Sequence, residues 1–130
     1  ICAADPIFHA GPSSYAAAFR HELVKRLGEY DFYLFVPMRD YFVHRHYIPA
    51  RFHDRLIALP YQRGDVNLDL KADFHVAPLP NVLTLMMMPI GASCYNKMSI
   101  SGCDGRPISE DQYFWGHHKA SQFNDKMADI

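Results

Sequence analysis

The chain of 130 residues has no long apolar run and little net charge. Its longest apolar run, about residues 82–92, contains Pro89 and is far shorter than the ~20 residues that a membrane-spanning helix needs. Thirteen Lys and Arg against fourteen Asp and Glu leave a formal charge of -1, so no whole-chain basic field attracts nucleic acid. We therefore expect neither a transmembrane segment nor a nucleic-acid partner.

Cysteine is also scarce, because only Cys2, Cys94 and Cys103 occur, widely spaced and without a Cys-x-x-Cys pair. This pattern favours neither a disulfide framework nor a thiolate zinc site, and it fits a reducing compartment. No initiator Met and no signal peptide are visible before Asp5-Pro6. We expect a cytoplasmic location, which includes the inner face of the membrane, and a chain cut from a longer protein.

The composition is that of a globular domain, with 49% hydrophobic, 14% aromatic and 21% charged residues. These fractions exclude disorder and collagen-like repetition. At this length one domain over residues 1–130 is expected.

Apolar and β-forming runs predict short strands that alternate with helical patterns. The strands are expected at residues 1–4, 32–36, 56–59 and 97–101. Helices are expected from Ser13 or Ser14 to a stop at Gly28, within residues 39–53, and at residues 82–94, where Pro89 kinks or divides a buried helix. The polar residues 62–80 predict a long loop that could serve as a lid. This alternation predicts an α/β fold with a mainly parallel sheet and helices on both faces.

In a parallel α/β sheet, ligands bind beyond the carboxyl ends of the strands. Three loops leave such ends here, at residues 5–11, 37–40 and 102–106. In the last, Asp104 can accept hydrogen bonds from hydroxyls and Arg106 can bind phosphate or carboxylate. Taken alone, however, the Gly-Cys-Asp-Gly sequence favours a plain tight turn in which Asp104 caps the next segment.

An aromatic cluster, Tyr113-Phe114-Trp115, leads into His117, His118 and Lys119. Aromatic rings stack on sugars and bases, and histidine suits proton transfer near neutral pH. The alternative is an aromatic core patch that closes a C-terminal helix onto the sheet.

Eight histidines suggest a metal hypothesis based on His44, His46 and His53. A metal needs three or four converging ligands. This spacing matches no zinc motif, and on a helix His44 and His46 would diverge, so we expect no metal.

The ordered series of motifs resembles the bacterial sialyltransferases of the Campylobacter lipooligosaccharide type and the related MptE-like proteins. Gly116-His117-His118-Lys119 is similar to the Gly-His-Ser-Lys segment of that family, and Ser101-Gly102-Cys103-Asp104 is similar to its Ser-Gly-Ile-Asp. The opening strand and Gly-Asn-Gly-Pro-Ser loop of the family have no counterpart here. The arginine that the family carries ahead of the buried helix also has no counterpart, because residues 79–81 occupy its place.

The resemblance implies a Rossmann-like, metal-independent glycosyltransferase without a cofactor, which transfers a sugar from a nucleotide sugar such as a CMP-sugar to a glycan. By this resemblance, His117 is expected to be the general base. Asp5 and Asp104 lie near the nucleotide, and Arg106, Tyr113 or Lys119 hold the departing phosphate.

The alternative from another class is a non-catalytic module on the same scaffold that binds a carbohydrate or a nucleotide. In that case Tyr113-Phe114-Trp115 stacks on the ligand and His117 only satisfies a core polar contact. Exposed aromatics would also be compatible with an oligomer.

Overall fold

A computed structural model describes residues 1–101 of the chain. Its described part mixes helices with a small parallel sheet, in which β1 (Leu34–Pro37) pairs with β2 (Leu56–Leu59). Leu34 lies opposite Leu56, and Pro37 opposite Leu59. The predicted strand at residues 56–59 is confirmed, and the one at residues 32–36 begins two residues later.

The N-terminal segment runs beside β1 as a third parallel segment of minimal length. Cys2 forms a parallel bridge with Phe35, and the Ala3 N–H donates to the Phe35 carbonyl at 3.0 Å. The predicted strand at residues 1–4 is therefore reduced to a bridge. The order across the sheet is N-terminal segment, β1, β2.

The long helix α2 (Ser14–Glu29) begins as predicted but ends later than predicted. The Ser13 hydroxyl caps its first turn by accepting the Ala16 N–H at 3.1 Å. Gly28 was expected to stop the helix, but it lies within the last turn. The end needs no left-handed glycine because Arg55 donates to the carbonyls of Leu27, at 3.2 Å, and Tyr30, at 3.0 Å.

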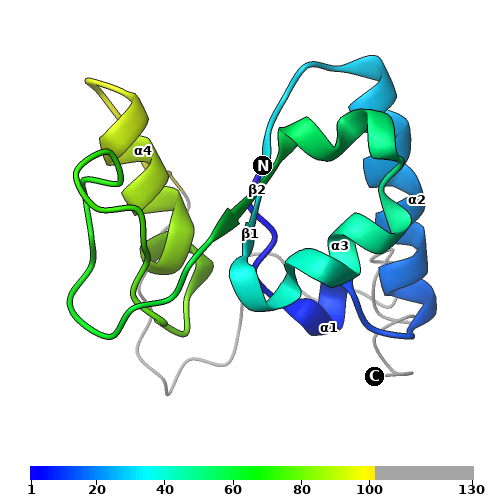
Figure 1. Cartoon of the computed structure of the whole chain (residues 1–130), viewed down its shortest axis with the longest axis horizontal. Helices are drawn as coiled ribbons and strands as arrows, with labels where there is room; N and C mark the ends of the chain where they lie inside the picture. The colour runs from blue at the N-terminus through cyan, green and yellow to red at the C-terminus, as the bar shows by residue number, and fades with distance from the viewer. Residues whose placement is uncertain (102–130) are drawn as a thin grey trace.

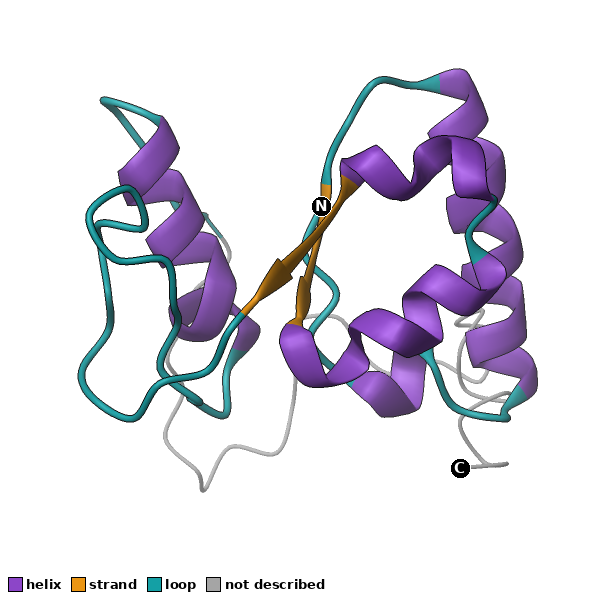
Figure 2. Cartoon of the chain, viewed as in Figure 1, coloured by secondary structure: helices purple, strands orange, loops and turns teal. Residues whose placement is uncertain are grey.

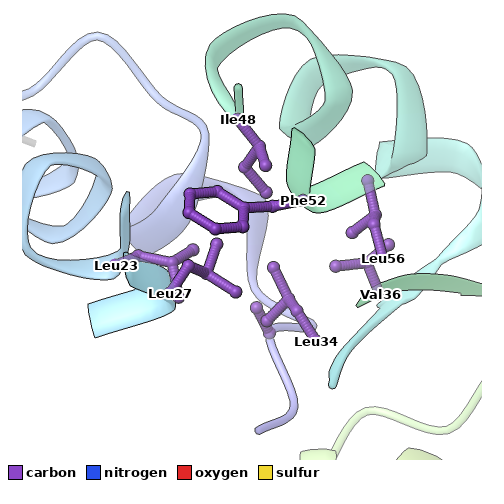
Figure 3. Close-up of a cluster of buried hydrophobic side chains, with 8 residues drawn as sticks. Leu23, Leu27, Leu34, Val36, Ile48, Phe52 and Leu56 are labelled. Atoms are coloured by element: carbon purple, nitrogen blue, oxygen red, sulfur yellow. The ribbon is translucent and has the colours of Figure 1, made fainter. Parts of the chain in front are cut away.

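One face of the strands is covered by helices on the side of α2 and α3 (Tyr41–Tyr47), as Figure 1 shows. Leu34, Val36 and Leu56 project to this side because alternate residues of a strand point to the same face. They pack against Leu23 and Leu27 of α2, and against Ile48 and Phe52, the latter in the 3-10 helix η2 (Ala50–Arg55); Figure 3 shows this cluster. The predicted helix within residues 39–53 is thus two short helices that flank Pro49.

The other face is covered by the helical segment made of η3 (Leu83–Met87) and α4 (Met88–Cys94), which Figure 2 shows across the strands from α2. Leu59 of β2 packs there with Leu85 and Met86. Pro89 was expected to kink or divide this helix, and the helical segment instead continues through it and changes from π to α hydrogen bonding just before Pro89. Its ring is incompatible with regular α-helical bonding, and the preceding turn is a π-helix in which the Met88 N–H donates to the Leu83 carbonyl. Helices therefore lie on both faces of the strands.

The long loop at residues 62–80 has the expected lack of regular structure, but its middle is packed rather than free. Leu70 and Val76 are buried in the second core cluster. Tyr61 forms a parallel bridge with Val76. The loop ends, near Pro78 and Pro80, on the wall of a pocket.

Two other predictions are wrong. Residues 97–101 form no strand, because nothing in the described part pairs with them; Met98 instead places its sulfur over Gly91. The loop expected at residues 5–11 contains the single helical turn α1 (Pro6–His9), since Pro6 suits the first helical position. Among the described residues, no helix is both long and apolar enough to cross a bilayer.

Candidate functional site

A pocket of about 660 Å³ lies where the parallel segments end. We call it the strand-end pocket. The chain enters its lining just after each segment, with Asp5 after the N-terminal segment, Arg39 after β1 and Tyr61 after β2. The remaining lining residues, mostly apolar, are Ala4, Pro6, Pro78, Leu79, Pro80, Asn81, Val82 and Leu85. The volume and the mixture of apolar walls with a few polar groups are typical of small-molecule sites.

Arg39 supplies the one positive charge among the described residues that line this pocket. It stands directly after β1, which ends at Pro37, in the 3-10 turn η1 (Met38–Asp40). Its guanidinium carbon lies 5.6 Å from the centroid of the Tyr61 ring, and its Nε donates to Asp40 Oδ2 at 3.4 Å. These two neighbours orient the guanidinium. Because the side chain remains 58% exposed, its other N–H donors stay available for an anion.

Tyr61 presents a half-buried ring beside Arg39. Burial raises the pKa of its phenol, and the nearby Arg39 partly opposes that effect. The hydroxyl therefore keeps its proton at neutral pH and can donate a hydrogen bond to a ligand.

The opposite wall is formed by the end of the long loop and the start of the helical segment. Pro78, Leu79 and Pro80 offer apolar surface without side-chain donors or acceptors. Asn81 fixes the turn, because its Oδ1 accepts the Leu83 N–H at 2.8 Å and its carbonyl accepts the Leu85 N–H at 2.8 Å. This wall is suited to the flat face of a ring.

Asp5 is the one predicted site residue that the structure describes, and it lies in this pocket. It is exposed at the start of α1, and its backbone carbonyl accepts the His9 N–H at 3.2 Å. Asp5 and Arg39 thus place a carboxylate and a guanidinium in one lining. A polar ligand with both hydroxyl and anionic groups matches that pair.

The other predicted site residues lie outside the described residues. They are His117, Asp104, Arg106, Tyr113 and Lys119. Their roles stay predictions from the sequence.

Arg39 and Tyr61 were not singled out by the sequence. The signal for Arg39 was present, because residues 37–40 were recognised as a loop that leaves a strand end. Tyr61 gave a similar signal by following the second strand and Pro60. The wall at residues 78–80 gave none, because its place depends on how the loop returns to the sheet.

The histidines considered for a metal site do not converge. His44 is buried and its Nδ1 shares a hydrogen bond of 2.6 Å with the Tyr47 hydroxyl. His46 is exposed on α3, and His53 Nε2 donates to the Ile48 carbonyl at 2.8 Å. Within residues 1–101, no group of three or more side chains is arranged to hold a metal ion.

No model of a known protein family, no curated protein sequence and no solved structure matches this chain. Its function must therefore be inferred from its own residues.

Proposed function

We propose that the strand-end pocket binds the nucleotide part of a nucleotide sugar, and that the chain is part of a Rossmann-like, metal-independent glycosyltransferase. The observation that supports this is the position of Asp5 and Arg39. They follow two neighbouring parallel segments and line the same pocket. Strand-end pockets of this kind are where α/β sheets bind nucleotides.

Each group in the lining has a part in this proposal. The Arg39 guanidinium binds the phosphate, for which its paired donors are suited. The Asp5 carboxylate accepts hydrogen bonds from ribose hydroxyls, and the Tyr61 hydroxyl donates to a phosphate or carbonyl oxygen. The apolar wall at residues 78–80 lies against the base.

The reaction itself is assigned to residues 102–130 from their resemblance to the bacterial sialyltransferases. The acceptor hydroxyl oxygen bonds to the anomeric carbon of the donor sugar, and the bond from that carbon to the phosphate oxygen breaks. His117 takes the hydroxyl proton, while Arg106, Tyr113 or Lys119 stabilises the departing phosphate, as Asp104 orients the nucleotide.

Calorimetric titration of the full chain with CMP and with cytidine tests the binding. We expect CMP to bind about tenfold more tightly, because only CMP offers Arg39 a phosphate. Arg39→Gln should remove this difference, while Arg63→Gln, at an exposed position outside the lining, should keep it. Equal affinity for the two ligands, or an unchanged preference in Arg39→Gln, would contradict the proposal.

Turnover is tested by the release of CMP from a CMP-sugar in the presence of a glycan acceptor. We expect His117→Ala to abolish release without a change in the thermal midpoint, and His118→Ala to retain it. The non-catalytic binding module is the second candidate, since the described lining offers binding groups and contains no residue to which this proposal assigns the proton transfer. CMP binding without any release would favour that module.

A further inference from the structure

A second concave surface lies between α2 and α3, which cover one face of the strands. Two adjoining cavities, of about 530 and 370 Å³, share Arg20 and Tyr47 in their linings. The two cavities therefore adjoin at these residues, and we call them together the α2–α3 groove. It shares no lining residue with the strand-end pocket.

The charged residues of α2 that line the groove are cationic, and the two carboxylates of the helix are engaged by Arg26. Both helical carboxylates, Glu22 and Glu29, pair with Arg26, at 2.6 and 3.0 Å. On the side that faces the groove, Arg20, His21 and Lys25 line the cavities. No aspartate or glutamate stands among the described residues of this lining, so nothing within it neutralises Arg20 and Lys25.

The other wall is apolar and unusually exposed. Phe42 and Val43 of α3 line the larger cavity with 74% and 44% of their surfaces open to solvent. His44, on the opposite side of the same helix, is buried. A phenylalanine this exposed beside a cavity marks a surface that a partner can cover with a favourable change in free energy.

The two residues that both cavities share are already held in place. Arg20 donates to the Gly11 carbonyl at 2.8 Å, and its guanidinium carbon lies 5.9 Å from the centroid of the Tyr47 ring. The Tyr47 hydroxyl is in turn bonded to His44 at 2.6 Å. Binding therefore requires little ordering of these side chains, which lowers its entropic cost.

We propose that the α2–α3 groove is a docking site for an acidic peptide segment of a partner protein, which inserts a bulky apolar side chain beside Phe42 and places carboxylates near Lys25 and Arg20. Charge complementarity supports an acidic partner, since the lining carries cations and no carboxylate. The shape supports a peptide, because the two cavities that share Arg20 and Tyr47 offer space for separate side chains of one segment. Apolar anchors that occupy a groove between helices are a common mode of peptide recognition.

Fluorescence anisotropy of the full chain with a labelled peptide of alternating glutamate, leucine and phenylalanine tests this proposal. We expect saturable binding that weakens as the salt concentration rises. A matched peptide with glutamine for glutamate, and another with serine for leucine and phenylalanine, should each bind at least about fivefold more weakly.

Matched variants test whether binding occurs in the groove. Lys25→Glu and Phe42→Ser should each weaken peptide binding about fivefold or more. Lys71→Glu and Phe74→Ser make the same chemical changes at exposed positions in the loop at residues 62–80 and should leave it unchanged. Equal effects of the groove and loop variants would overturn the proposal.

Sedimentation with phosphatidylserine vesicles gives the membrane alternative its own outcome. We expect no cosedimentation that depends on Phe42 or Lys25. Vesicle binding lost in Lys25→Glu and Phe42→Ser, combined with no peptide binding, would assign the surface to a membrane instead and overturn the peptide proposal.

Discussion

The Nδ1 atom of His44 lies 2.6 Å from the hydroxyl oxygen of Tyr47, one turn further along α3. The imidazole is only 1% exposed. Burial is the main reason that the pKa of His44 falls from 6.5 to about 4; His9 and Arg20 lower it further, and Asp40 opposes them. His44 is therefore a neutral residue inside the helical layer at neutral pH.

The depressed pKa of His44 makes the stability of the protein sensitive to acid. As the pH falls below 6.5, His44 gains a proton in the unfolded chain, whereas in the folded chain it does so only near pH 4. The unfolded state then binds more protons, so the free energy of unfolding should decrease between pH 6.5 and about 4, by about 3 kcal/mol. Burial also lowers the pKa of His9, which adds a loss in the same direction.

Urea unfolding at a series of pH values across this interval measures the effect. His44→Asn should flatten the dependence, even though it lowers stability at neutral pH by removing a buried ring. His21→Asn alters an exposed histidine and should keep the wild-type slope. A slope in His44→Asn equal to that of the wild type would show that another group is responsible.

Ser93 fixes the long loop to the second helical layer. Its buried Oγ accepts the Leu70 N–H at 2.7 Å and donates to the Pro89 carbonyl at 2.7 Å. Ser93→Ala leaves the Leu70 N–H without its partner, so we expect a loss of about 1–3 kcal/mol in the free energy of unfolding and faster hydrogen exchange at the Leu70 amide. Ser99→Ala, at an exposed serine, should change neither; equal behaviour of the two variants would refute this role.

Gly28 offers a position at which the protein can be stabilised. It lies in the last turn of α2, and a Cβ there would stand 3.9 Å from Phe52 Cζ, an ordinary contact distance. Gly28→Ala should raise the free energy of unfolding by about 0.5–1 kcal/mol, because alanine favours the helix and restricts the unfolded chain.

Gly64 is the matched control for this substitution. Its φ of +152° suits glycine alone, although no atom crowds the place of a Cβ. Gly64→Ala should therefore destabilise the protein. Thermal unfolding of the two variants decides the matter, and a lower midpoint for Gly28→Ala would contradict the expected gain.

Local patterns predicted the elements whose signals lie within a few residues. An N-cap at Ser13 or Ser14, the strand at residues 56–59 and an irregular helix at Pro89 could be predicted, because a capping hydroxyl, a short apolar run and a proline act on neighbouring backbone. The end of α2 could not be read, since it depends on Arg55, which comes from another element. The predicted strand at residues 97–101 was wrong for a similar reason, because a strand requires a pairing partner and no local pattern supplies one.

Only part of the predicted site can be compared with the pocket, because residues 102–106 and 113–119 lie outside the described residues. Parallel strands place their carboxyl ends at one edge, and residues from the segments 5–11 and 37–40, which were expected to leave such ends, line one pocket. Which of their side chains line the pocket depended on local geometry, such as the turn that directs Arg39 over Tyr61.

Backbone preference and side-chain periodicity make the start of α2, the strand at residues 56–59 and the polar residues at strand ends predictable from the order of amino acids alone. The packing of whole elements is what brings Asp5, Arg39 and Tyr61 to one pocket and what forms the α2–α3 groove. Both features join residues far apart in the chain, and their contact depends on how whole elements pack, which no local pattern encodes.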